Sequence, residues 1–261
     1  MKSFINTSFV ILAVALLVAS ASAQQASNPP FDFPTHTTPE PFERPRDDRR
    51  TLQQEDRVLK KGTLAPTEND RNLFSSFLRG RNTGLIRLMP REVYESETYH
   101  TKKQLNIRGG GAYYSFANLT HVYGYGNDLE LDRNILSVGF AGADYGMLTS
   151  IDDRPLEDIT LNDPRARFIA QYKPPTREPV ARSEYRRFQA GVMIDGALYR
   201  TRLPVQVGTT YLLRSVVYAD SDVLVALRVI RRDSDGSVII AWKLLKKYPK
   251  PELARTNQAA N

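Results

Sequence analysis

Aromatic residues gather in one short stretch of the chain. Tyr113, Tyr114, Phe116, Tyr123 and Tyr125 lie within thirteen residues and are interleaved with glycines. Exposed aromatic rings on a sheet stack on the faces of sugars and other flat ligands. We therefore predict a ligand-binding surface at the four tyrosines. The competing interpretation is that alternate members, such as Tyr114 and Phe116, are buried in the core and the rest line a turn.

Basic residues form three groups later in the chain, and the whole chain has a formal net charge of +7. An excess of positive charge favours anionic surfaces. Arg228 and Lys243 are the two basic residues that we assign to the same binding surface, and solvated strand ends explain most of the others. The groups are Arg182, Arg186 and Arg187; Arg228, Arg231 and Arg232; and Lys243, Lys246, Lys247 and Lys250.

Catalytic residues are not recognisable in the sequence. The chain has no cysteine and no Gly-x-Ser-x-Gly segment, and its three histidines are His36, His100 and His121. It has 29 carboxylates. Glycoside hydrolysis needs two carboxyl groups about 5 to 9 Å apart across a cleft, a distance that a sequence does not reveal. A carboxylate-based hydrolase therefore stays an alternative, with its catalytic residues unknown.

The patterns that resemble metal or phosphate sites are incomplete. His100 and His121 are not at a zinc-ligand spacing. Asp233-Ser234-Asp235-Gly236 resembles the opening of a calcium loop but lacks its terminal Glu, so we predict a hairpin turn. The three glycines at 109–111 lack the Lys-Ser/Thr and the following helix of a phosphate loop. We predict no metal and no cofactor.

These side chains must be positioned by strands, because alternation of apolar and polar residues dominates the second half of the chain. About ten short strands with Gly, Asn and Asp turns predict a mainly β protein, either an antiparallel sandwich or an irregular barrel. The strands are expected over residues 104–108, 112–116, 129–131, 135–140, 147–151, 167–172, 192–194, 197–199, 209–218, 223–232 and 237–247.

Two hairpins are defined most clearly. Asp195-Gly196 between residues 192–194 and 197–199 indicates a type I′ turn. For the longer hairpin, a four-residue turn at 233–236 avoids placing Arg228 opposite Lys243. This turn pairs Arg228 with Ala241 and Asp222 with Lys247. It also aligns three apolar pairs on one face: Val225 with Leu244, Leu227 with Trp242 and Val229 with Ile240. The opposite face is partly polar, and we expect another layer to cover half of it.

One or two short helices are expected before the strands. A thin apolar stripe predicts a helix over residues 52–61. Thr67 is an expected N-cap, with Asp70 in the first turn, and Gly80 ends this second helix. Leu73, Phe74, Phe77 and Leu78 are expected on one face of it.

The N-terminus has the order of regions typical of a secretory signal peptide. Lys2 precedes an apolar run over residues 9–18, and Ala21-Ser22-Ala23 supplies the small residues for cleavage. The run is about half of the roughly twenty residues that cross a bilayer, although an uncleaved anchor is the alternative. We predict a signal peptide over 1–23, cleaved after Ala23, and a secreted or periplasmic protein.

The rest of the chain divides by composition. Residues 24–62 are rich in proline and charge and predict a flexible leader. Residues 63–252 are expected to form a single β-rich domain, and 253–261 a disordered tail. The mature chain has no second long apolar segment.

Together these features predict an exported, non-catalytic β-domain that binds or organises an envelope or extracellular component. The expected partner is a glycan, an anionic polymer or another exported protein. Nucleic acid is a poor candidate, because an exported protein rarely meets it and no binding motif is present. The alternatives are the secreted hydrolase and a structural subunit of an envelope assembly.

Overall fold

The computed structural model of the chain describes residues 64–93, 110–121, 126–139 and 142–254. Every described residue belongs to one compact unit, within residues 46–261. The expected signal peptide, the whole expected leader over 24–62, the helix over 52–61 and the strand over 104–108 lie outside the described residues, as do Tyr123 and Tyr125. In the described ranges, no helix has the length and apolar character that a membrane crossing requires.

The described residues form a mainly β, sandwich-like fold of 11 strands in three antiparallel sheets, none of them closed into a barrel, which confirms the expected class. The large sheet has the order β1-β11-β10-β9-β5, the second has the order β2-β3-β4-β8, and β6 and β7 pair by themselves. The strands are β1 (Thr83–Leu88), β2 (Tyr113–Tyr114), β3 (Leu129–Asp132), β4 (Ile135–Ser137), β5 (Tyr145–Ser150), β6 (Val192–Ile194), β7 (Ala197–Tyr199), β8 (Arg202–Pro204), β9 (Thr210–Val217), β10 (Ser221–Arg232) and β11 (Val238–Lys247).

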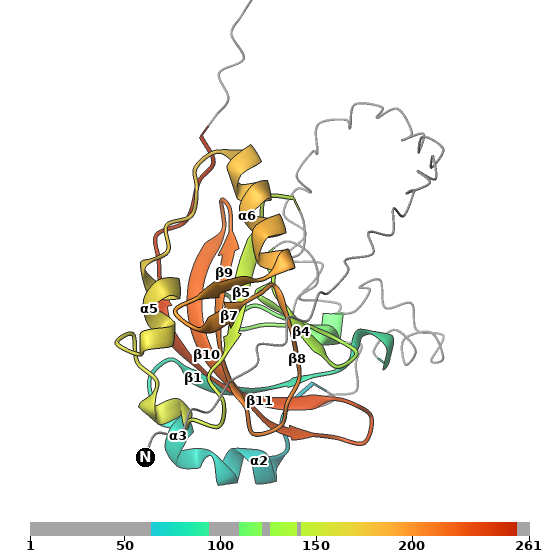
Figure 1. Ribbon diagram of the computed structural model, residues 1–261. Helices are drawn as coiled ribbons and strands as arrows, with labels where there is room; N and C mark the ends of the chain where they lie inside the picture. The colour runs from blue at the N-terminus through green and yellow to red at the C-terminus, as the bar shows by residue number, and fades with distance from the viewer. Residues whose placement is uncertain (1–63, 94–109, 122–125, 140–141, 255–261) are drawn as a thin grey trace, which may run out of the picture. The chain divides into compact units, whose positions relative to one another are not determined.

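The large sheet is the middle layer, because both of its faces are buried. On one face, Val225 and Leu227 of β10 pack in a cluster with Leu131 and Leu136 of the second sheet. On the other face, Leu224 and Ala226 belong to a cluster that includes residues of two helices (Figure 1). This arrangement confirms that another layer covers the partly polar face of the hairpin. The helical elements are α2 (Glu68–Leu73), α3 (Ser75–Leu78), α5 (Pro164–Gln171), α6 (Glu178–Ala190) and the 3-10 turns η1 (Gly110–Ala112) and η2 (Leu156–Asp158).

The two hairpins follow the sequence in most of their pairs, but the expected four-residue turn of the long hairpin is wrong, since Arg232 pairs with Val238 and residues 233–237 lie between the strands. Asp195 and Gly196 have φ angles of 49° and 75°, as the type I′ turn requires. In the long hairpin, Arg228 faces Ala241 and the three apolar pairs are those predicted. The expected pairing of Asp222 with Lys247 is wrong, since Val223 occupies that place. The register shifts at 224/225 and at 229/231, so each strand has one extra residue, a β-bulge. Matching side chains across the hairpin does not predict such bulges.

Two segments that we expected to be strands or strand ends are helices. Residues 167–172 lie almost entirely in α5, because Asp163 caps its N-terminus by accepting from the amide of Arg165 and Pro164 fits its first turn. Arg182, Arg186 and Arg187 lie on α6, which also has a proline in its first turn and ends at Gly191. Strand β1 was not expected at all.

The N-terminal helix is only partly as predicted. Thr67 is the N-cap and forms a reciprocal capping box with Asp70. The helix then breaks at Phe74 into α2 and α3. Leu73 is 73% exposed, so the expected apolar face does not extend along its whole length.

Candidate functional site

Tyr113 and Tyr114 lie inside the protein, only 5% and 6% exposed. The hydroxyl of Tyr113 donates to Glu130 Oε1 at 2.8 Å. The ring of Tyr114 meets those of Phe116 and His121 edge-on, and burial raises its pKa to about 12. Neither tyrosine presents the exposed ring on which the predicted stacking surface depends. Tyr114 matches the competing interpretation, whereas Tyr113, which that interpretation placed along a turn, is also buried, in β2. A role for them in ligand binding stays a prediction.

Arg228 and Lys243 hold a loop against the large sheet. Arg228 Nη1 donates to the carbonyl of Arg154 at 3.0 Å, and Lys243 Nζ donates to the carbonyl of Ile159 at 3.1 Å. Ile159 belongs to the cluster on the helical face of the sheet, whereas Tyr114 belongs to the cluster on the opposite face. The structure therefore does not bring Arg228 and Lys243 together with Tyr114, while Tyr123 and Tyr125 lie outside the described residues.

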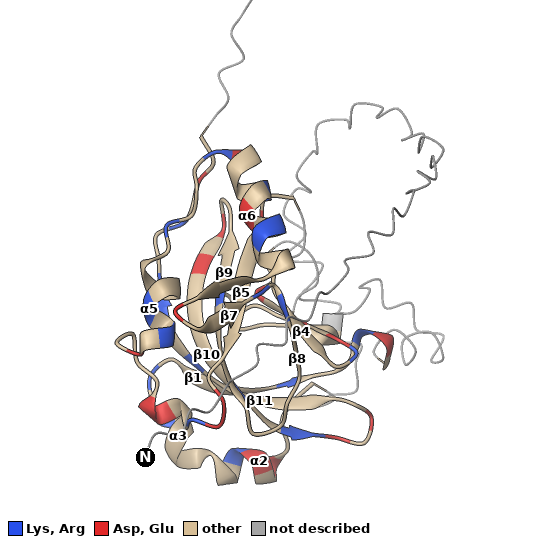
Figure 2. Cartoon of the chain, viewed as in Figure 1, with Lys and Arg blue, Asp and Glu red and all other residues tan. Residues whose placement is uncertain are grey.

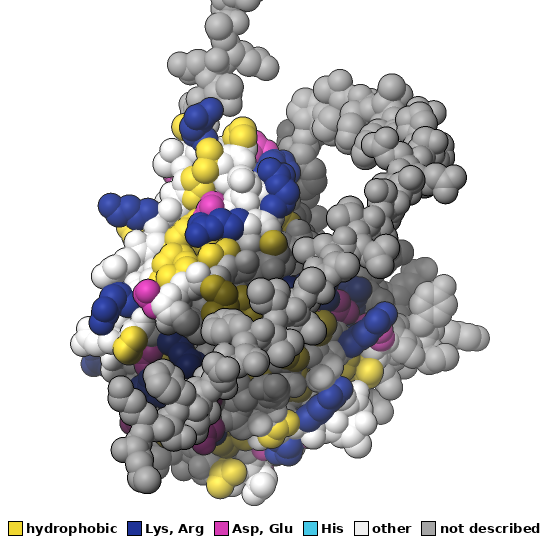
Figure 3. Space-filling model, viewed as in Figure 1, with side chains coloured by type: hydrophobic (Ala, Val, Ile, Leu, Met, Phe, Trp, Pro, Cys, Tyr) yellow, Lys and Arg dark blue, Asp and Glu magenta, His cyan; other side chains and the backbone are white. Residues whose placement is uncertain are grey.

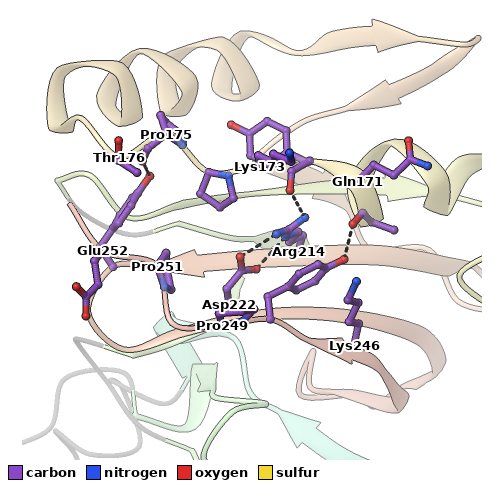
Figure 4. A pocket seen from close by; sticks show the side chains of 15 residues that line it. Gln171, Lys173, Pro175, Thr176, Arg214, Asp222, Lys246, Pro249, Pro251 and Glu252 are labelled. Carbon is purple, nitrogen blue, oxygen red and sulfur yellow. Dashed lines mark hydrogen bonds and ion pairs between the residues drawn. The ribbon is translucent and has the colours of Figure 1, made fainter. Parts of the chain in front are cut away.

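A groove of about 500 Å³ lies elsewhere, between two irregular segments that cover the helical face of the large sheet. One wall is the link from α5 to α6, residues 170–176, and the other is the end of β11 with the residues that follow it, 246–252. Pro174 and Pro175 belong to the first wall and Pro249 and Pro251 to the second, and Figure 4 labels Pro175, Pro249 and Pro251 around the opening. The groove is open to solvent, and prolines and tyrosines make up nearly half of its lining residues.

The floor of the groove is a buried ion pair. Arg214 of β9 and Asp222 of β10 are 1% and 2% exposed, and two hydrogen bonds of 2.8 Å join them. Arg214 Nη1 also donates to the carbonyls of Ile169 and Tyr172 at 2.5 and 2.8 Å, at the C-terminal end of α5. A cation there pairs with carbonyls that a helix end leaves free. The guanidinium lies 3.7 Å from the ring centre of Tyr248, so one residue joins the floor to both walls.

Tyrosine hydroxyls fix the walls in place. Tyr248 donates to the carbonyl of Ala170 at 2.8 Å, and Tyr218 donates to the carbonyl of Pro175 at 2.5 Å. At the end of the groove, the amide of Ala254 donates to the carbonyl of Thr176 at 2.7 Å. Ala254 falls in the segment that we expected to be a disordered tail, so the ordered chain extends beyond residue 252.

Charged side chains stand at the rim of the groove. Lys173 and Lys246 are exposed on opposite walls, and Glu252 is exposed at the other end of the groove from Lys246 (Figure 4). Lys246 Nζ lies 4.5 Å from the ring centre of Tyr248. Across the molecule, Lys and Arg are spread over several elements rather than concentrated on one (Figure 2). In the space-filling view, hydrophobic side chains run between α5 and α6 with basic side chains beside them (Figure 3).

Burial raises the pKa of several carboxylates. In the groove it raises the pKa of Asp222, although the hydrogen bonds from Arg214 lower it in part, whereas Asp128 and Asp144 do not line the groove. Burial raises the pKa of Asp128 to about 6, and its Oδ2 accepts from the amides of Phe116 and Ala117 at 2.6 and 3.2 Å. Burial also raises the pKa of Asp144 to about 6, and this carboxylate accepts from the amide of Tyr218. Both therefore hold backbone in place. Among residues 64–254 as described, no three histidine or carboxylate side chains converge as metal ligands.

His121 is also part of the structure rather than of the groove. Its Nδ1 lies 3.0 Å from the carbonyl of Tyr113, and burial lowers its pKa to about 4. The ring is therefore neutral at pH 7, with Nδ1 donating to the carbonyl. A neutral histidine packed against Tyr114 stabilises the second sheet.

The groove was not found from the sequence, although one signal was present. Arg214 interrupts the apolar strand Thr210–Val217, and Asp222 stands at the start of the next strand of the same hairpin. A charged side chain within a fully buried strand requires a partner of opposite charge. The sequence therefore contained a signal for a buried ion pair between these two residues. No known protein family, curated protein or solved structure shows a significant match to the chain.

Proposed function

We propose that the chain is an exported, non-catalytic binding protein that holds its ligand in the groove over Arg214 and Asp222. The observation that supports this proposal is the groove itself, a concave site of about 500 Å³ with a buried, fully paired floor. Ligand sites are typically concave, mostly apolar and largely preformed. A rigid floor also lowers the entropy lost on binding, because few side chains need to be ordered.

Binding is favoured over catalysis by the bonding of the polar groups in the groove. The hydroxyls of Tyr218 and Tyr248 donate to backbone carbonyls, and Asp222 is occupied by Arg214. A general acid or base must lie within hydrogen-bond reach of the substrate proton that it moves. These groups are committed to the protein instead. The other carboxylate that lines the groove, Glu252, is exposed at its rim, so the hydrolase stays an alternative.

The site is tested by filling the groove. Thr176→Trp places a large side chain between the walls and keeps the backbone carbonyl that accepts from Ala254. Ser183→Trp makes the same chemical change on the exposed side of α6 and is the matched control. When a ligand that binds in the groove is titrated into the ¹⁵N-labelled mature chain, we expect the amide resonances of Lys173 and Lys246 to shift. These shifts should persist in Ser183→Trp and vanish in Thr176→Trp. Ligands that bind both variants equally would place the site elsewhere.

The expected export has its own test. Protein recovered from outside the cytoplasm should begin at Gln24, since cleavage after Ala23 removes the apolar run. N-terminal sequencing measures this directly. An exported protein that begins at Met1 would contradict the proposal.

A further inference from the structure

Basic residues gather in the two segments that form the walls. Residues 170–177 and 246–254 contain Lys173, Arg177, Lys246, Lys247 and Lys250, of which Lys173 and Lys246 line the groove, and one acidic residue, Glu252, which also lines it. In the part of the chain that the structure describes, none of these five basic residues forms an ion pair, and Arg214 and Asp222 below them pair with each other. The two segments therefore have an excess of positive charge. Such a surface attracts anionic ligands and speeds their association.

The interior of the groove, by contrast, has few free polar groups. The hydroxyls of Tyr218 and Tyr248 already donate to the protein, and the four prolines have no amide hydrogen. A sugar carries several hydroxyls, and each of them loses hydrogen bonds to water unless the site replaces them. Among the uncharged polar side chains that line the groove, only those of Gln171 and Thr176 are left, so it offers few partners to a sugar with several hydroxyls. Apolar or proline side chains need none and pack directly on aromatic rings and prolines.

We infer that the groove binds an extended acidic peptide segment of a partner protein, with proline or apolar residues in the groove and Asp or Glu at the lysine rim. The inference rests on the proposed binding function and names its ligand class. An extended segment fits because the walls are themselves irregular chain running beside each other, joined by the hydrogen bond from Ala254 to Thr176. Aromatic grooves recognise extended proline-containing peptides in this way, because such peptides lose little entropy on binding.

The probe is a displayed library of 12-residue peptides, selected on the mature chain after depletion on Thr176→Trp. We expect the enriched peptides to contain proline or apolar residues flanked by Asp or Glu. Enriched peptides that are neutral or basic would overturn the inference. A glycan array is probed in parallel with the same two proteins. A glycan that binds in a Thr176-dependent way, without any peptide, would overturn the peptide inference and leave the proposed function standing. If neither probe gives Thr176-dependent binding, the proposed function fails as well.

The charge contribution is tested with two neighbouring lysines. Lys246 lines the groove, whereas Lys247 follows it on β11 and does not. For the best acidic peptide, we expect Lys246→Glu and Lys173→Glu each to weaken binding about fivefold at low salt, as for exposed ion pairs near the upper end of their range. Lys247→Glu makes the same change of charge and should weaken binding less than twofold. Equal losses for Lys246→Glu and Lys247→Glu would show that the rim lysines do not contact the peptide.

Discussion

Asp222→Leu should be among the most destabilising substitutions in the protein, because it leaves Arg214 buried without its partner. Arg214 is 1% exposed, and its Nε and Nη2 both donate to Asp222 at 2.8 Å. Losing one hydrogen bond to a charged group costs roughly 1.5–3 kcal/mol, so losing two costs about 3–6 kcal/mol. Breaking a buried ion pair by removing one partner typically costs about 3–5 kcal/mol, which agrees. We therefore expect a loss of about 4 kcal/mol in the free energy of unfolding.

The assay is urea-induced unfolding followed by the fluorescence of Trp242. This residue is the single tryptophan of the chain and lies 5% exposed in a core cluster, so it reports on global unfolding. Arg228→Met, on the same strand β10 as Asp222, is a control. Arg228 is only partly buried, and losing its bonds to the carbonyl of Arg154 and to Thr210 should cost about 1 kcal/mol.

A double variant separates the ion pair from the packing around it. Arg214→Met with Asp222→Leu removes both charges and leaves the carbonyls of Ile169 and Tyr172 without their donor. We expect it to lose less stability than either single variant, since no isolated charge remains buried. Two results would refute this reasoning. One is a loss below 1 kcal/mol in Asp222→Leu, and the other is a double variant whose loss equals the sum of the single losses.

Three further changes have defined outcomes. Gly146→Ala would place Cβ 2.4 Å from the carbonyl oxygen of Arg214, so the urea midpoint should fall by the equivalent of about 3 kcal/mol, and an unchanged midpoint would contradict the packing. Thr67→Ala removes the N-cap of α2 and should cost about 1 kcal/mol in the same assay, whereas Thr67→Ser should retain most of the stability. Folding raises the pKa of Asp128 from 3.8 to about 6, so its protonation stabilises the fold below pH 4 and this contribution is lost as pH rises through 6. Between pH 4 and pH 6 the free energy of unfolding should fall by about 3 kcal/mol. Asp128→Asn lacks this titration, so its free energy of unfolding should depend less on pH. An identical pH dependence in both proteins would refute this prediction.

The parts of the fold that were predictable from the sequence depend on local chemistry. Asp195-Gly196 sets the turn of its hairpin through positive φ angles, and the long hairpin has one register that buries Leu227 opposite Trp242. These signals act between neighbouring residues or directly paired strands. The residues that decide these two features can therefore be identified from the sequence alone.

The two helices were mispredicted for a different reason. Residues 167–172 alternate like a strand, but Asp163 and Pro164 just before them start a helix, and the cap outweighs the alternation. In α6, Ala181 and Phe188 are the residues that face the core, seven apart, while the arginines between them resembled the polar end of a strand. Apolar residues at helical spacing were present in α6, but there were only a few of them.

The candidate site was beyond reach of pattern reasoning, because it is made by tertiary packing. Its walls are 70 to 80 residues apart in the chain, and no motif links them. Tyr113 and Tyr114 illustrate the converse, since a dense local cluster of aromatic residues proved to be core. Clustering along the sequence does not distinguish a binding surface from a packed interior.

The walls of the groove combine residues of two kinds. Tyr172 and Tyr248 pack against a core cluster, and Arg214 and Asp222 hold the floor within the sheet. Lys173, Lys246 and Glu252, by contrast, are exposed at the rim. Substitutions at these three rim residues therefore change the charge of the groove at little cost to the β-sandwich, so the ligand preference of this site is separable from the stability of the fold that carries it.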